Sequence, residues 1–142
     1  MTRRTYKLAG VVYAVLSLGG IGRGDALLRI PEADRAILAR VAADYKLDGE
    51  SRRLLYAIRL AEDGGAGREM GVLTPAAQRY KGDHAKSLKL QARWAAGTIR
   101  KRYTGDLEAF AARWAPVGAA NDPENTNKNW LPNVRRLMRK GR

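Results

Sequence analysis

Residues 54–73 read LLYAIRLAEDGGAGREMGVL, and this stretch decides the fold of the chain. Its apolar residues recur at the spacing of one helix face: Leu54, Leu55, Ile58 and Ala61. This spacing predicts an amphipathic helix that ends near Glu62. Gly64 and Gly65 follow, and glycine readily takes the left-handed conformation that ends many helices. Residues 66–73 are glycine-rich and too short for a helix, so we expect a loop or a small hairpin there.

Helical patterns also lie on both sides of this stretch. We expect a helix that opens at Pro31 before it, with Ser51 as the N-cap of the central helix. The later helices are expected to open at Thr74-Pro75, at Asp106 and at Trp130. Residues 116–129 are polar and predict a loop. The sequence therefore predicts a mainly α fold: one small domain with at most one short β-hairpin.

Composition excludes several kinds of active site. The chain has 142 residues, which suits a single domain, and it contains no cysteine and one histidine. Disulfide scaffolds, thiol nucleophiles, thiolate zinc sites and multi-histidine metal sites are thereby excluded. We expect neither a metal nor a cofactor. If the protein is an enzyme, its acid–base chemistry should depend on carboxylates.

The charge is concentrated at the two ends of the chain. There are 27 Lys and Arg against 14 Asp and Glu, a formal net charge of +13. Residues 1–24 and 131–142 contain nine of the basic residues and no acid. Basic ends of this kind suit an acidic polymer or surface, such as nucleic acid, anionic lipid or a bacterial envelope. We expect them to hold the protein near an acidic cell envelope.

The N-terminal segment has the pattern of an export signal. A basic start is followed by the uncharged residues 8–22, LAGVVYAVLSLGGIG, which are short for a membrane span. We therefore divide the chain into residues 1–24, a signal peptide or signal-anchor with a possible membrane contact at 8–22, and residues 25–142, the folded domain. The alternative is that this segment forms a buried first helix of a soluble fold.

Glu62 is the main candidate for chemistry. A carboxyl group at a helix end beside a glycine-rich turn can sit half-buried next to a cleft. Desolvation and the partial negative charge of the helix C-terminus then both raise its pKa, which suits a general acid. The alternative is a solvated glutamate at a frayed helix end.

This segment resembles the catalytic segment of the lysozyme-like superfamily, which includes lytic transglycosylases and phage muramidases. In that family the catalytic Glu ends a helix and a glycine-containing hairpin follows; Glu62 falls on the first position and residues 67–73 on the second. The downstream motifs RWAPVG (113–118), NDP (121–123) and NW (129–130) are similar to the C-terminal part of small phage and prophage wall-degrading domains. The resemblance covers roughly residues 50–140. Many transglycosylases have Ser after the Glu, where this chain has Asp63.

The resemblance implies a site in which Glu62 is catalytic. Its substrate-binding residues would be Glu69, Gly71, Val72, Gln91, Asn121, Asn129 and Trp130. Glu69 is either a second carboxylate or an ion-pair partner of Arg68 or Arg79. Trp130 either stacks on a sugar ring or anchors the last helix. Trp94 and Trp114 lie at apolar helical positions and are expected in the core.

The implied activity is cleavage of the β-1,4 bond between N-acetylmuramic acid and N-acetylglucosamine in peptidoglycan, by an exported or virion-associated enzyme of a phage or prophage. One Glu acting first as acid and then as base fits both hydrolysis and lytic transglycosylation. The competing interpretations are a basic nucleic-acid-binding protein and a virion structural protein. No recognised nucleic-acid motif accompanies the basic residues, so no specific nucleic acid is expected as a partner.

Overall fold

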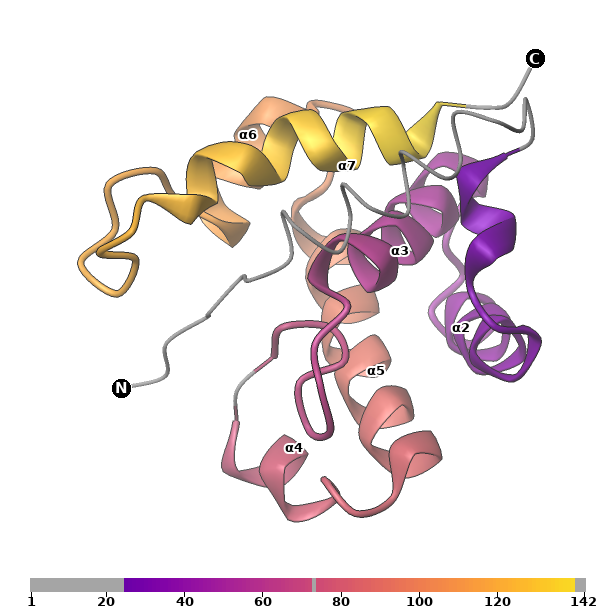
Figure 1. Ribbon diagram of the computed structural model, residues 1–142. Helices are drawn as coiled ribbons and strands as arrows, with labels where there is room; N and C mark the ends of the chain where they lie inside the picture. The colour runs from indigo at the N-terminus through magenta and orange to yellow at the C-terminus, as the bar shows by residue number, and fades with distance from the viewer. Residues whose placement is uncertain (1–24, 73, 140–142) are drawn as a thin grey trace.

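Helices dominate the structure, a computed structural model that describes residues 25–72 and 74–139 (Figure 1). The elements are η1 (Ala26–Arg29), α2 (Glu32–Asp44), α3 (Gly49–Glu62), α4 (Pro75–Arg79), α5 (His84–Arg102), α6 (Leu107–Trp114), η2 (Thr126–Asn129) and α7 (Trp130–Met138). The predicted mainly α class is confirmed.

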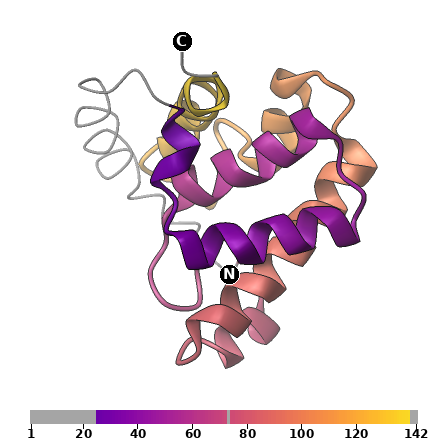
Figure 2. The ribbon, with the colours of Figure 1, turned by 90° about the vertical axis from the view of Figure 1, so that its right-hand side faces the viewer.

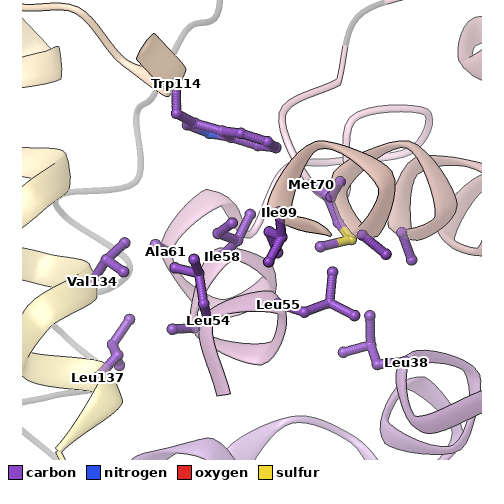
Figure 3. Close-up of a cluster of buried hydrophobic side chains, with 14 of the residues drawn as sticks. Leu38, Leu54, Leu55, Ile58, Ala61, Met70, Ile99, Trp114, Val134 and Leu137 are labelled. Carbon is purple, nitrogen blue, oxygen red and sulfur yellow. The ribbon is translucent and has the colours of Figure 1, made fainter. Parts of the chain in front are cut away.

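Helix α3 runs through the centre of the fold. Helix α7 packs along one side of it, while α2 and α5 cross each other on the other side (Figures 1 and 2). Leu54, Leu55 and Ile58 of α3 have no exposed surface, and Figure 3 shows them between the apolar side chains of α7 and α2. Each such side chain stabilises the fold by about 1.5–3 kcal/mol. This packing fixes the C-terminal end of α3 in the middle of the molecule.

At each end of α3, the residue that caps the helix is not the predicted one. The N-cap is Asp48 and not Ser51: the Asp48 carboxylate accepts a 2.7 Å hydrogen bond from the Ser51 backbone N–H. The backbone of Asp48 is extended, and Ser51 lies three residues later, which is the geometry of a capping aspartate. At the other end Asp63, not a glycine, takes the left-handed conformation, with φ 32° and ψ 41°. Aspartate tolerates this region better than most residues.

The predicted hairpin after α3 is wrong for the described residues of that segment. Residues 63–72 form tight turns, in which Arg68 N–H donates to Gly65 and Gly71 N–H donates to Arg68. Another backbone N–H, that of Met70, donates instead to the side chain of Gln91 on α5, at 2.9 Å. Because these groups bond within turns or to α5, no cross-strand ladder forms between them.

The predicted export segment lies outside the described residues. The export or anchor role of residues 1–24, and the membrane contact at 8–22, therefore stay predictions from the sequence. In the described ranges, no helix combines the length and the apolar character that crossing a membrane requires.

Candidate active site

Glu62, the last residue of α3, is enclosed by two tryptophans. Its Oε1 atom accepts a 3.0 Å hydrogen bond from the indole Nε1–H of Trp114 and a 3.1 Å bond from that of Trp130. The glutamate is 0% exposed, and the two indoles are 3% and 5% exposed. The frayed, solvated helix end that the sequence left open is therefore not what forms.

An aromatic cluster positions these two donors. Phe110 and Trp114 of α6 stack with ring centroids 5.6 Å apart, and Trp130 at the start of α7 lies 6.3 Å from Trp114. Such pairs add stability beyond the area they bury and fix ring orientation. Two helices from the C-terminal half thus hold their indole N–H groups at the carboxyl end of α3.

Gly71 closes the site from the loop side. Its φ is +69°, and a Cβ atom added there would lie 2.7 Å from the Glu62 carboxyl carbon. Only glycine has both the backbone freedom and the space that this position requires. The backbone of the 63–72 loop therefore rests directly on the carboxyl group.

Glu62 lies away from water, with the indole N–H groups of Trp114 and Trp130 directed at one of its carboxylate oxygens. The neighbouring Asp63 does not share this environment, because its carboxylate faces Arg59 Nη1 at 3.5 Å. Asp63 is therefore a poor chemical partner for Glu62.

The loop is held to the rest of the fold by Glu69. Its side chain is 1% exposed and accepts hydrogen bonds from the Gly67 N–H (2.9 Å), the Ser87 hydroxyl (2.8 Å) and the Gln91 amide (3.0 Å). No ion pair with Arg68 or Arg79, the partners considered from the sequence, is found among the described residues. These three donors come from the loop and from α5, so Glu69 braces the loop against that helix.

A buried ion pair supports the same loop and was not foreseen. Arg59 of α3 bonds Asp34 of α2 at 3.0 Å and the Glu69 carbonyl at 3.2 Å. His84 Nε2 lies 2.8 Å from the second oxygen of Asp34. A basic residue inside an apolar helix face was the one sequence signal for this arrangement, since a buried Arg must find an acid.

The remaining predicted substrate contacts fall into two groups. Val72 and Gln91 are buried with the loop, next to Gly71 and Glu69 respectively. Asn121 and Asn129 are half-buried in the segment between α6 and α7. Trp94, expected in the core, is instead 45% exposed on α5. The prediction that Trp94 lies in the core is therefore wrong, and the same prediction for Trp114, which is 3% exposed, is confirmed.

Asp122 organises the polar segment that leads to Trp130. Its carboxylate accepts from the N–H and hydroxyl of Thr126 at 2.9 and 2.8 Å and from the N–H of Asn127 at 2.7 Å. Burial acts to raise the pKa of Asp122, but the bonds from Asn127 and Thr126 outweigh it and lower the pKa below its usual value. This turn fixes where α7 begins.

Within the described ranges, no three His, Asp or Glu side chains lie close enough together to hold a metal ion. The chemistry this arrangement offers is proton transfer by a shielded carboxyl group. Comparisons of the chain with models of protein families, with curated proteins and with solved structures found no match.

Proposed function

We propose that the protein is a peptidoglycan-degrading glycosidase in which Glu62 is the general acid. The bond cleaved would be the β-1,4 linkage between N-acetylmuramic acid and N-acetylglucosamine. The observation that carries the proposal is the enclosure of a single carboxyl group by two indole donors at the end of the central helix. A glutamate shielded from water is suited to hold a proton and deliver it to a glycosidic oxygen.

The mechanism needs only this carboxyl group and the substrate. Protonated Glu62 donates its proton to the glycosidic oxygen as the C–O bond breaks, and the carboxylate left behind keeps the two indole hydrogen bonds. The carboxylate then takes a proton from the group that attacks the sugar. If that group is water, the product is a reducing sugar; if it is the 6-hydroxyl of the same sugar, the product is an anhydro sugar. Both remain open.

The enclosure also sets a requirement. Glu62 has no exposed surface in this structure, so the loop that rests on it must move before a glycan reaches the carboxyl group. The 63–72 loop is suited to such a movement because it is built from turns, without a strand ladder. Its hold on α5 depends on a few side-chain hydrogen bonds, chiefly those of Glu69 and Gln91.

The setting we propose is the bacterial envelope, reached by export or as part of a virion. The basic termini would keep the enzyme near its acidic substrate, and Arg136 and Arg139 at the end of α7 are exposed as this requires. The membrane contact through residues 8–22 belongs to the same proposal.

The test is mass spectrometry of the soluble products after incubation with purified peptidoglycan. Disaccharide muropeptides with a reducing end would indicate hydrolysis, and anhydro-muropeptides would indicate lytic transglycosylation. A gel shift with duplex DNA at several salt concentrations runs in parallel. Intact peptidoglycan together with a salt-dependent shift would overturn the proposal in favour of the nucleic-acid binder.

One observation favours a second candidate, a virion structural protein that keeps the fold without the activity. The complete burial of Glu62 suits a carboxylate that merely ties α3 to the two tryptophans. Specific binding to peptidoglycan without any soluble product would support this candidate.

A further inference from the structure

A pocket is lined in part by Trp114, one of the two indole donors to Glu62. This pocket, of about 410 Å³, opens between the C-terminal half of α5 and α6. Its walls are aromatic: Trp94 and Trp114 meet with ring centroids 5.6 Å apart at an interplanar angle of 60°, and Phe110 also lines it. Trp94 is 45% exposed and so accessible to a ligand, while the other two tryptophans stay buried.

The rim of the same pocket is cationic. Lys101 and Arg102 from the last turn of α5 line it, together with Arg113 from α6. None of the three forms an ion pair with a carboxylate of the described residues, whereas Arg53, Arg59 and Arg135 elsewhere do. Three cations beside an open indole therefore lack a counter-ion from the described part of the chain, so the pocket is complementary to an anionic ligand that carries a flat or ring-shaped group.

The pocket and Glu62 share one residue. The ring of Trp114 lines the pocket, while its Nε1–H donates to the Glu62 carboxylate at 3.0 Å. A ligand in the pocket thus lies one indole away from the proposed acid. The pocket is therefore adjacent to the proposed acid.

We propose that this pocket binds a carboxylate-bearing sugar residue of the substrate, with the sugar ring against Trp94 and the carboxylate on Arg102 and Arg113. The inference rests on the proposed function and deepens it: the substrate class is glycan whose muramoyl groups carry free carboxylates, directly or on a stem peptide. A neutral glycan of the same length lacks the group that the cations would bind. Arg pairs with carboxylate through two parallel hydrogen bonds, which makes the contact directional as well as strong.

The shape of the pocket favours a sugar over a nucleic acid. Proteins that bind single strands present successive aromatic platforms for successive bases along a basic groove. Here Trp94 is 45% exposed while Trp114, tilted by 60° to it, is only 3% exposed, so the pocket offers one aromatic platform and not a row of them. The volume of about 410 Å³ likewise suits a single small ligand unit.

The experiment measures binding without cleavage, in the full chain carrying E62Q. Two probes of equal glycan length are titrated: a disaccharide muropeptide with free carboxylates and the neutral disaccharide of N-acetylglucosamine. Calorimetry gives the affinity. The change in tryptophan fluorescence on binding reports contact with Trp94, and this change should be lost in W94F. We expect the muropeptide to bind about tenfold tighter, a ratio typical of one hydrogen-bonded charged group, with a difference that shrinks as salt rises.

Matched variants locate the effect. R102Q/R113Q should reduce muropeptide affinity by about tenfold or more and leave the neutral disaccharide unchanged. The control R93Q/R100Q removes the same charge from exposed positions of α5 that do not line the pocket, and it should bind both probes as the parent does. Equal melting temperatures for the two double variants would show that folding is not the cause.

Several results would overturn the inference. Equal affinity for the two probes would show that the carboxylate is not recognised. Equal losses of affinity in the two double variants would show that Arg102 and Arg113 do not form a specific site. Tighter binding of a single-stranded oligonucleotide that is lost only in R102Q/R113Q would assign the pocket to nucleic acid instead. The proposed function is judged separately: muropeptide binding without any cleavage by the wild-type protein would leave this site standing while the glycosidase proposal fails.

Discussion

Glu62 and Glu69 are two buried carboxyl groups at opposite ends of one loop, and they differ in what surrounds them. Both are at most 1% exposed. Glu69 accepts three hydrogen bonds from polar donors, one in its own loop and two on α5. Glu62 accepts from the indole N–H groups of two tryptophans, and a glycine backbone is packed against its oxygens.

The difference separates a bracing carboxylate from one suited to chemistry. Glu69 has its lone pairs directed at fixed protein donors, and moving it breaks the loop away from α5. Glu62 is surrounded by aromatic rings, the surfaces that sugars stack on, and its cover is a loop and not a helix. Burial is the same for both carboxyl groups, so the proposed acid role of Glu62 rests on its different surroundings.

The largest effect is expected from Glu62→Gln. The amide keeps an oxygen for the two indole donors, so the fold should persist, but it has no proton to transfer. Clearing of peptidoglycan should fall at least ~10²-fold, the low end of the contribution of a general acid. Activity within a factor of two of wild type, at an unchanged melting temperature, would exclude Glu62 as the acid.

Gly71→Ala tests the contact between the loop and Glu62. The substitution places a Cβ against the carboxyl group and strains a residue at φ +69°. We expect a loss of unfolding free energy of about 2 kcal/mol, because left-handed strain alone costs about 1–2 kcal/mol. Gly65→Ala is the control, since nothing lies within 4 Å of a Cβ there. Equal stability of the two variants in urea unfolding would show that the loop does not rest on the acid.

Glu69→Gln should act on stability and spare the chemistry. One oxygen of the Glu69 carboxylate now accepts hydrogen bonds from both the Ser87 hydroxyl and the Gln91 amide. An NH₂ group of glutamine in that place would be a donor facing two donors. We expect a loss of about 1–2 kcal/mol, with activity per folded molecule maintained or raised because the loop opens more easily. Glu108→Gln, at an exposed glutamate paired with Arg135, is the matched control and should change little. An activity loss as large as that of Glu62→Gln would make Glu69 part of the reaction.

The smallest effect concerns Asp122, a third carboxylate that positions Trp130 from a distance. Because its hydrogen bonds lower its pKa in the folded state, its stabilisation is present above the unfolded value of about 4 and is lost as pH falls through the folded pKa. Asp122→Asn should therefore cost about 1 kcal/mol near neutral pH and progressively less as the pH falls below about 4. Urea unfolding at several pH values measures this; a gap that stays constant would mean that the charge plays no part.

Most of the helices were predictable because their signals are local, although the single helix expected from Pro75 onward is divided into α4 and α5. The apolar spacing of residues 54–61 and the caps at Thr74 and Asp106 depend on residues within one or two turns, and both caps are confirmed. The hairpin was predicted wrongly because the conformation of residues 63–72 is set by groups distant in sequence. The Gln91 side chain accepts a hydrogen bond from the Met70 N–H, and the Arg59 side chain donates one to the Glu69 carbonyl. These backbone groups therefore bond to side chains of α5 and α3 and not to a second strand.

The place of Glu62 at a helix end was predictable, but its hydrogen-bond partners were not. Glu62 could be singled out from its place at the end of an apolar-striped helix before glycines. Its two indole donors lie 52 and 68 residues away in sequence, and no periodicity indicates which polar atom a buried tryptophan will meet. The exposure of Trp94 was missed for a related reason: an apolar position on a helix is buried only if another element covers it, and no described element fully covers this one.

The two indole N–H groups that bond one oxygen of Glu62 can report the protonation state of that carboxyl group. Since Trp114 and Trp130 donate to the same atom, their two indole protons should change resonance frequency together as that carboxyl group gains or loses its proton. The chain has three tryptophans, and Trp94 on the exposed face of α5 supplies a reference signal. A nitrogen-labelled sample carried through a pH series would therefore record the titration of one buried acid at two independent positions, without any substitution at the acid itself.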